Sequence, residues 1–316
     1  MKDETKILLT GSSGFIATNL YNTFHKDFNL LGLDITTKGE FPASTVYSWK
    51  QLDQLPHVTT IIHLAGKAHD TKNTSDPQSY FHINLGLTQK IFDFFLESDA
   101  EKFIFFSTVK AVADSVEGEY LTEDIEPNPQ TPYGQSKQEA EKYILSKKLP
   151  AGKKVYILRP CMIHGPGNKG NLNLLYSIVK KGIPWPLGAF ENKRSFLSID
   201  NLSFVIRQLI EKDIEPGAYQ VADDEPLSTN QLFSIIAESL GKKPRVYNIS
   251  RGLIKCLAKT GDLLHLPLNT ERLKKLTESY VVSNSKLKAA LGIDRMPVSA
   301  RDGLVRTLES FKGTER

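Results

Sequence analysis

Short hydrophobic runs recur along the first half of the chain, separated by segments of helical character. The runs are KILLT from residue 6, LLGLD from 30, TIIHLAG from 60, KFIFFS from 102 and KVYILR from 154. Apolar runs of this length are consistent with strands buried in a parallel sheet. Residues 19–25, 77–96 and 133–147 predict helices between them. The alternation therefore predicts an α/β fold with a doubly wound parallel sheet.

The regular alternation weakens after residue 159, where prolines and glycines become frequent. The later segments predict a strand at 217–221 and helices at 202–211, 230–240, 250–264, 270–278 and 283–291. We expect residues 1–160 to form the first domain and residues 161–316 to form mainly a smaller α+β domain. The helix around 200–212 is expected to return to the first domain.

The composition narrows the class of protein. The 316 residues are 40% hydrophobic and 24% charged, and no apolar run is long enough to span a bilayer. The start of the chain does not read as a signal peptide, and Cys161 and Cys256 cannot make a disulfide framework, so we expect a cytoplasmic protein. A net charge of +4, distributed along the chain, argues against nucleic acid and tolerates an anionic substrate. We expect no membrane partner and no metal.

A glycine-rich turn follows the first hydrophobic run. In GSSGFIA, Gly11 permits a tight turn and Gly14 lets the backbone approach a pyrophosphate, at the N-terminus of the next helix. Asp34 ends the second run, where a carboxylate can accept hydrogen bonds from a ribose diol and would repel a 2′-phosphate. Strand, turn, helix and acid together predict a Rossmann-type site for NAD. Its backbone contacts would come from Ser13, Phe15 and Ile16.

A tyrosine and a lysine stand four residues apart in TPYGQSK. Thr131 and Pro132 are suited to starting a helix, on which Tyr133 and Lys137 share one face. A neighbouring ammonium favours a phenolate, and such a phenol can exchange a proton with a substrate alcohol. Ser107 ends the preceding strand and could hydrogen-bond the same oxygen. Taken alone, the pair is more often an aromatic residue and a solvated charge; the upstream nucleotide-binding unit favours the chemical interpretation.

The sequence resembles the extended short-chain dehydrogenase/reductase family, the NAD-dependent nucleotide-sugar epimerases and dehydratases. The resemblance covers most of the chain and rests on TGSSGFIA, Asp34, HLAGKAH, HINLGLT, FFSTVKAV, PYGQSK, LRPCMIHGPG and SFLSIDNL. It implies an NAD-binding domain, a substrate domain and a catalytic set of Ser107 or Thr108, Tyr133 and Lys137. It also implies a homodimer formed by the 77–96 and 133–147 segments. Further cofactor contacts would come from Leu64, Ala65, Gly66 and Pro160.

The family includes several chemistries. In sugar 4,6-dehydratases an Asp-Glu pair follows the strand-end threonine, whereas Val109 and Lys110 follow Thr108 here. Without these carboxylates we reject dehydration. A UDP-hexose or UDP-N-acetylhexosamine 4-epimerase acting through a transient 4-keto sugar is expected. The alternatives are a UDP-4-keto-6-deoxy-N-acetylhexosamine 4-reductase of surface-polysaccharide synthesis and a non-catalytic NAD-binding module.

Several polar residues are candidates for holding a UDP-sugar. Arg194 suits a diphosphate, because a guanidinium matches phosphate oxygens with two prongs; a solvated loop charge is the alternative. For Asn171 a turn asparagine is equally plausible, and for Lys67 a solvated lysine. Asn84 either contacts the sugar or braces the strand that carries Ser107. Lys110 completes the candidate substrate contacts.

Overall fold

The computed structural model describes residues 5–67, 76–168, 170–264 and 269–313. In this part of the chain, seven parallel strands form one sheet in the order β3-β2-β1-β4-β5-β6-β9. The strand order reverses beside β1, so ligands are expected at the carboxyl ends of the strands there. The strands are β1 (Lys6–Thr10), β2 (Asn29–Asp34), β3 (Val46–Ser48), β4 (Thr60–His63), β5 (Lys102–Phe106), β6 (Lys154–Pro160) and β9 (Gly217–Val221).

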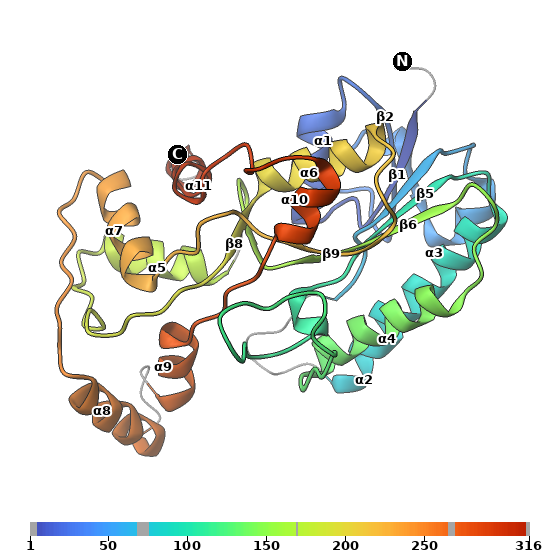
Figure 1. Cartoon of the computed structure of the whole chain (residues 1–316). Coiled ribbons are helices and arrows are strands. Elements are labelled where there is room, and N and C mark those ends of the chain that lie inside the picture. Colours follow the sequence, from blue (N-terminus) through green and yellow to red (C-terminus); the bar gives the residue numbers. More distant parts are fainter. Residues whose placement is uncertain (1–4, 68–75, 169, 265–268, 314–316) are drawn as a thin grey trace.

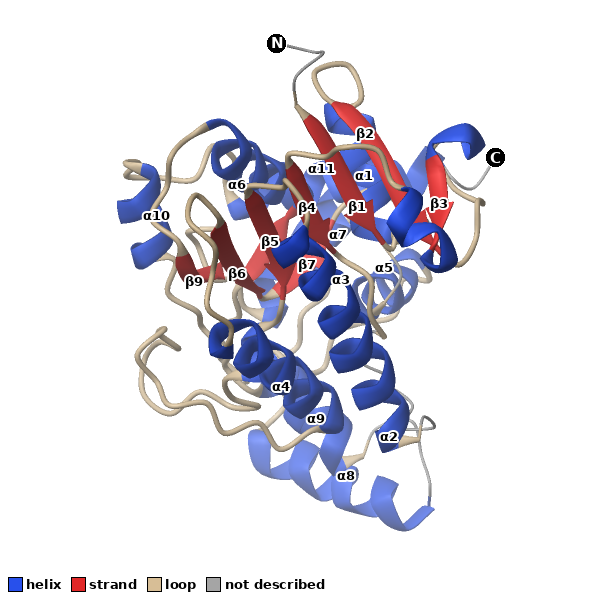
Figure 2. Cartoon of the chain, turned by 90° about the vertical axis from the view of Figure 1, so that its right-hand side faces the viewer, coloured by secondary structure: helices blue, strands red, loops and turns tan. Residues whose placement is uncertain are grey.

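Helices cover both faces of this sheet (Figure 2). One face packs against α1 (Phe15–Phe24), α6 (Ile199–Glu211) and α10 (Ser285–Leu291). The other packs against α3 (Gly86–Glu97) and α4 (Pro132–Ser146). The confirmed fold class is thus a doubly wound parallel sheet of Rossmann type, as the alternation predicts.

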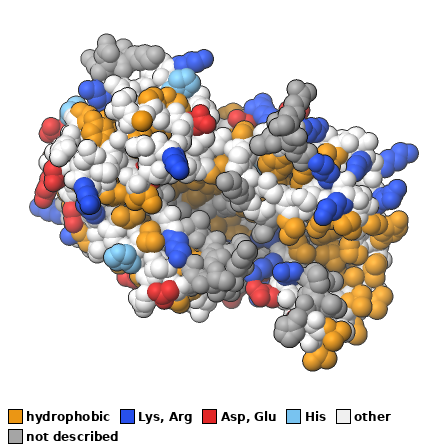
Figure 3. Space-filling model, turned by 180° about the vertical axis from the view of Figure 1, so that it is seen from behind, with side chains coloured by type: hydrophobic (Ala, Val, Ile, Leu, Met, Phe, Trp, Pro, Cys, Tyr) orange, Lys and Arg blue, Asp and Glu red, His pale blue; other side chains and the backbone are white. Residues whose placement is uncertain are grey.

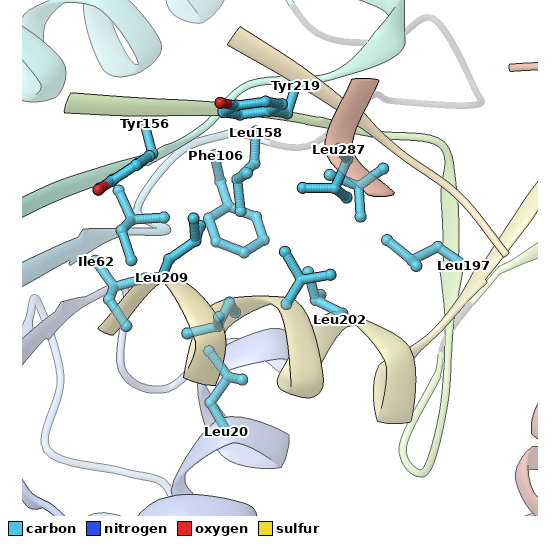
Figure 4. Close-up of a cluster of buried hydrophobic side chains, with 14 of the residues drawn as sticks. Leu20, Ile62, Phe106, Tyr156, Leu158, Leu197, Leu202, Leu209, Tyr219 and Leu287 are labelled. Carbon is cyan, nitrogen blue, oxygen red and sulfur yellow. The ribbon is translucent and has the colours of Figure 1, made fainter. Parts of the chain in front are cut away.

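Buried aliphatic side chains join the first face to its helices (Figure 4). Leu20 of α1 and Leu202 and Leu209 of α6 lie on the same cluster as Ile62 and Phe106 of the sheet, and all are at most 4% exposed. Because interiors of this kind are close-packed, the carboxyl ends of β4 and β5 are held in fixed positions. A rigid sheet edge is what a precise site requires.

The second half has its own core. It contains residues of α5 (Asn171–Lys180), α7 (Thr229–Ser239), α8 (Arg251–Leu264), α9 (Thr270–Thr277) and α11 (Ala300–Gly313). A small parallel sheet is formed by β7 (Met162–His164) and β8 (Phe196–Ser198). Of β8, Leu197 belongs to the core of the large sheet and Phe196 to the core of the second half. We propose that the cofactor unit comprises residues 1–160 with α6, β9 and α10, and that the rest of 161–316 forms the substrate unit (Figure 1).

Local structure departs from the sequence-based expectation in a few places. The helix expected at 77–96 is α2 (Pro77–Tyr80), one π-helical turn (Phe81–Leu85) and α3. Helices α5 and α11 and the short strands β3, β7 and β8 are not predicted from the sequence pattern. These strands have three residues each, too few for a period to show. In the described ranges, no helix has the length and apolarity to cross a bilayer.

Candidate active site

The glycine turn joins β1 to α1. Gly11 has a left-handed φ of 70°, and a methyl group there would lie 2.9 Å from the Cα atom of Ala65. Gly14 donates its N–H to the Gly11 carbonyl over 2.9 Å and precedes the first residue of α1. No side chain of the described residues caps this helix. The first N–H groups of α1, beginning with Phe15 and Ile16, therefore point at a cradle suited to a phosphate.

Asp34 lies at the end of β2 beside this turn. Its carboxylate accepts the N–H of Ser13 over 2.8 Å and that of Ile35 over 2.6 Å. The same bonds fix the turn and hold the carboxylate at the sheet edge, where a ribose diol can donate to its remaining lone pairs. Just past the end of β4, which pairs with β1, Leu64 and Ala65 donate their N–H groups to the Thr10 hydroxyl over 3.1 and 3.0 Å.

The N-terminus of α4 is firmly anchored. Thr131 caps it by accepting the N–H of Gly134 over 3.3 Å, and Pro132 occupies the first turn, as the sequence predicts. Asp114 accepts the N–H of Gln130 over 2.7 Å and that of Thr131 over 3.3 Å. These bonds tie the preceding loop to the helix and so determine where the next residue, Tyr133, stands.

Tyr133 is half-buried and its side chain hydrogen-bonds Thr108. Burial raises the pKa of this phenol, the Thr108 hydrogen bond lowers it, and the nearby Tyr80 raises it. That Lys137, with an oxidised nicotinamide, favours the Tyr133 phenolate stays a prediction. The Lys137 ammonium itself donates to the Phe106 carbonyl over 2.8 Å.

Lys137 is 5% exposed and lies at the ends of two strands. Its Nζ bonds the last residue of β5, and it stands 3.3 Å from where a methyl group on Gly66 would lie, beyond the end of β4. Burial lowers the pKa of Lys137 to about 8, although the carboxylate of Glu141 opposes the shift. A side chain at Gly66 would therefore crowd this ammonium and would lie closer still, at 2.9 Å, to Asn84 Oδ1.

Ser107 and Thr108 are both buried but take different partners. Ser107 donates to Glu141, which forms a buried ion pair with Arg159 of β6; Arg159 Nη2 and Glu141 Oε2 are 2.5 Å apart. Thr108 instead bonds Tyr133. Of the two alternatives, this geometry favours Thr108 as the hydroxyl that shares a substrate oxygen with Tyr133, while Ser107 belongs to the support beneath it.

Glu141 is a functional candidate that the sequence analysis missed. It follows Lys137 by four residues, so Tyr133, Lys137 and Glu141 lie along one stripe of α4. The spacing of four residues is the sequence feature from which Glu141 could have been identified. Its partner Arg159 lies on a strand 18 residues away, and only the folded sheet brings the two together.

Asn84 is fully buried, and both the oxygen and the nitrogen of its side-chain amide form hydrogen bonds within the protein. Its oxygen accepts the N–H of Lys67 over 2.7 Å, and its nitrogen donates to Ser136 over 2.9 Å. Of the two roles considered, these bonds favour bracing, between α4 and the segment that carries Gly66. The Lys67 ammonium donates to Ser79 over 2.6 Å and lies 4.9 Å from the ring centre of Tyr80.

Lys110 and Arg194 come from different halves of the chain and influence each other. The Lys110 ammonium donates to the Asp114 carbonyl over 2.7 Å and lies 4.3 Å from the ring centre of Tyr280. Burial lowers the pKa of Lys110, Asp114 opposes this, and the positive charge of Arg194 lowers it further. Arg194 donates to the Lys275 carbonyl over 2.5 Å. Two half-buried cations so placed suit an anionic ligand.

The remaining candidates are placed as follows. Pro160 ends β6 in the buried part of the sheet. Asn171 begins α5, but its side chain lies outside the described residues. His63 is fully buried, with Thr10 and Thr88 within hydrogen-bond distance of its two ring nitrogens, which fits a core histidine. Burial lowers the pKa of His164 to about 4.

Comparison with known families decides the class of this site. A model described as the NAD dependent epimerase/dehydratase family matches residues 7–222. The chain belongs to this family. The match includes the glycine turn, Asp34, Thr108, Tyr133 and Lys137, so the predicted family and its NAD dependence are confirmed.

Two relatives in the NAD dependent epimerase/dehydratase family are 30% identical to this chain. One is a UDP-glucose 4-epimerase of Vibrio cholerae, matched over 96% of this chain and 95% of the relative. The other is an N-acetyl-α-D-glucosaminyl-diphospho-ditrans,octacis-undecaprenol 4-epimerase of Escherichia coli O157:H7, matched over 75% of this chain and 73% of the relative.

Solved structures share the fold at lower identity. MoeE5 in complex with UDP-glucose and NAD is similar with a TM-score of 0.76 and 20% identity, covering 98% of this chain and all of that one. A UDP-glucose 4-epimerase of Thermotoga maritima with UDP-glucose gives a TM-score of 0.76 and 21% identity, covering 99% and 100% of the two chains. These likenesses support the fold of the family from end to end.

Proposed function

We propose that this chain is an NAD-dependent nucleotide-sugar 4-epimerase that acts through a transient 4-keto sugar. The observation that carries the proposal is the meeting of three groups at the ends of β4 and β5. These are the hydrogen-bonded pair Tyr133–Thr108 and the buried ammonium of Lys137. The 4-epimerase relatives of V. cholerae and E. coli support the same chemistry.

The residues fit NAD. The turn and the start of α1 offer an uncapped helix N-terminus for the pyrophosphate, through Gly11, Ser13, Gly14, Phe15 and Ile16. A methyl group on Gly11 would lie 2.9 Å from the Cα atom of Ala65, so the close approach of the turn to that backbone requires glycine. Asp34 would accept the ribose hydroxyls. Past the strand ends, Leu64, Ala65, Gly66 and Pro160 would line the path of the dinucleotide. When bound, NAD supplies a hydride acceptor and donor for the sugar carbinol, and its positive ring favours the phenolate.

The chain's own residues move and hold the proton. Tyr133 would take the proton from the sugar 4-hydroxyl and return it after the keto sugar has turned over. Thr108 would donate a hydrogen bond to the same oxygen. Lys137, with a pKa of about 8, would hold a ribose hydroxyl beside Tyr133 and supply positive charge once substrate excludes water.

Substrate binding is proposed for cations and amides from both halves of the chain. Arg194 and Lys110 suit the diphosphate, because both are half-buried and the positive charge of Arg194 is close enough to lower the pKa of Lys110. Lys67 and Asn171 are proposed to contact the nucleotide or the sugar. We assign Asn84 to bracing the site rather than to direct substrate contact, because its amide atoms bond Lys67 and Ser136.

A substrate panel tests the reaction. Purified protein is incubated with UDP-glucose, UDP-N-acetylglucosamine or UDP-4-keto-6-deoxy-N-acetylglucosamine, each with and without NADH. A 4-epimerase interconverts a UDP-sugar and its 4-epimer without added NADH. The alternative, a 4-reductase, consumes NADH in proportion to the keto sugar alone. Release of NAD on denaturation, with no turnover on any sugar, would instead indicate a non-catalytic module.

A second substrate form is a sugar diphosphate carried by a polyprenol. The E. coli relative, 30% identical over 75% of this chain, is named for such a compound. The diphosphate and the sugar are shared with a UDP-sugar, so the same Arg194 and Tyr133 would serve both. Incubation with polyprenyl-diphosphate-linked N-acetylglucosamine, compared with UDP-N-acetylglucosamine at equal concentration, distinguishes the two.

We also propose that the protein works in the cytoplasm as a homodimer formed by α3 and α4. These two helices pack side by side on one face of the sheet (Figure 2), and Leu145 of α4 is 66% exposed. Light scattering coupled to gel filtration measures the mass in solution. A mass of one chain at micromolar concentration would reject the dimer.

A further inference from the structure

Helix α8 has an apolar side that the rest of the described chain leaves uncovered. Ile254, Ala258 and Gly261 face the core. The exposed fractions of the leucines on its other sides are 53% for Leu253, 49% for Leu257, 78% for Leu263 and 59% for Leu264. The helix lies at one end of the molecule (Figure 1). From behind, a hydrophobic area bordered by Lys and Arg is seen at this end (Figure 3).

The leucines share a side because of their spacing. Leu253, Leu257 and Leu264 are four and seven residues apart, which is one stripe of a helix. Lys255 and Lys259 form a separate exposed stripe. A helix with a leucine side and a lysine side, lying on the surface, has the composition of segments that bind in the interface of a bilayer.

Positive charge is concentrated around α8. Residues 242–277 contain nine Lys or Arg and two Asp or Glu, a net charge of +7, whereas the whole chain has +4. The remainder therefore carries −3, and the expectation that charge is distributed along the chain is wrong. The nine cations are Lys242, Lys243, Arg245, Arg251, Lys255, Lys259, Arg272, Lys274 and Lys275.

We propose that α8 docks this protein on the surface of an anionic lipid bilayer. Leu253, Leu257 and Leu264 enter the headgroup region, while Lys255 and Lys259 meet lipid phosphates. The sequence-based expectation of no membrane partner rested on the lack of a spanning segment. An interfacial helix needs no such segment, so the absence of a spanning helix among the described residues is compatible with docking.

Charge decides between a bilayer and a second copy of the chain. A two-fold dimer through α8 would bring two segments of net charge +7 face to face, which is unfavourable at physiological salt. An anionic bilayer attracts the same segment, with a contribution from each Lys or Arg near its surface. The exposed apolar area and the positive charge of α8 thus both favour an anionic bilayer as the partner.

Docking at α8 would also orient the candidate site. The helix packs against α9, and the carbonyl of Lys275 in α9 accepts the Nη1–H of Arg194 over 2.5 Å. The proposed diphosphate ligand Arg194 is therefore connected to the docking helix through one short element. Binding to the bilayer does not depend on which sugar the site accepts.

Vesicle co-sedimentation of the full chain with NAD present tests the proposal. We compare vesicles of phosphatidylcholine alone with vesicles that contain about 30% phosphatidylglycerol. The anionic vesicles should bind the protein at least tenfold more tightly, and raising the salt from about 0.05 M to about 0.5 M should abolish most of the difference. Equal affinity for both vesicles, or no binding to either, would overturn the proposal.

Variants separate the two stripes of α8. Leu253→Ser combined with Leu257→Ser and Leu264→Ser should lower the vesicle affinity at least tenfold, and Lys255→Gln with Lys259→Gln should reduce its salt dependence. Leu174→Ser removes a comparably exposed leucine, 64% exposed, from α5 and should leave vesicle binding unchanged. NAD released on denaturation reports that each variant is folded. A leucine variant that keeps full vesicle affinity, or that halves the mass in solution, would contradict bilayer docking.

Discussion

Gly134 is a position in the candidate site where even a methyl side chain would clash with its neighbours. It directly follows Tyr133 in α4, and a methyl group there would lie 2.9 Å from Pro129 Cβ and closer still to the carbonyl oxygen of Lys110. The turn at Val109–Ala111 follows Thr108, so this close approach is what sets Tyr133 against Thr108. We predict that Gly134→Ala separates the two elements.

The displacement follows from the distances. Ordinary carbon contacts begin at 3.4 Å, so relieving the Pro129 contact alone requires a shift of at least about 0.5 Å. A misplacement of about 1 Å in a catalytic geometry can lower turnover about a hundredfold. We therefore expect kcat to fall roughly ten- to a hundredfold. Overpacking costs typically about 1–3 kcal/mol in the free energy of unfolding. The helix preference of about 1 kcal/mol for alanine over glycine offsets part of this cost, so the variant should stay folded while it loses turnover.

Gly86→Ala is the matched control. Gly86 is also helical, with a φ of −62°, and a methyl group there meets nothing within 4 Å among the described residues. It should keep wild-type kcat and gain up to about 1 kcal/mol in the free energy of unfolding. Steady-state turnover and urea unfolding measure both variants. Wild-type kcat for Gly134→Ala would refute the inference that this contact positions Tyr133.

Two further predictions concern buried charge. Lys137→Met should abolish turnover yet stabilise the fold by up to about 3 kcal/mol at pH 7. The folded-state pKa of Lys137 is about 8, below the usual 10.5, so the destabilisation by the buried ammonium is complete below pH 8 and declines up to about pH 10.5. Urea unfolding at pH 7 and pH 10 should therefore show that the stability difference between Lys137→Met and wild type shrinks as the pH rises. A stability difference that does not change with pH would contradict the prediction. Glu141→Gln leaves Arg159 as an unpaired buried cation and should destabilise the fold by about 3–5 kcal/mol. The exposed pair of Glu139 and Lys142 on the same helix provides its control, since Glu139→Gln should change stability by less than about 1 kcal/mol; similar thermal unfolding of the two variants would contradict the assignment.

Local patterns predicted much of this molecule. The order of strands and helices follows from hydrophobic spacing, because a parallel sheet buries whole strands and needs crossover helices. The anchoring of α4 could be predicted from Thr131 and Pro132, since capping depends on neighbours in sequence. The same holds for the placement of Tyr133 and Lys137 on one helix face.

Partners far apart in sequence could not be predicted. Ser107 and Thr108 are adjacent hydroxyls, and only the folded chain shows that one bonds Glu141 and the other Tyr133. The raised pKa of Tyr133 likewise depends on burial, which no motif reports. The cluster of Lys and Arg around α8 can be seen in the sequence. Its interpretation as a bilayer-binding surface depends on which leucines of α8 are exposed, and only the structure shows this.

The most direct measurement of the central claim is the turnover of Tyr133→Phe. The variant should retain NAD, detected by its release on denaturation, while interconversion of the preferred sugar substrate falls at least about a hundredfold, the scale of lost acid–base catalysis. Tyr143, also on α4, donates its phenol O–H to Asp93 of α3, and Tyr143→Phe should keep wild-type turnover. Wild-type turnover in Tyr133→Phe with NAD bound would contradict the account.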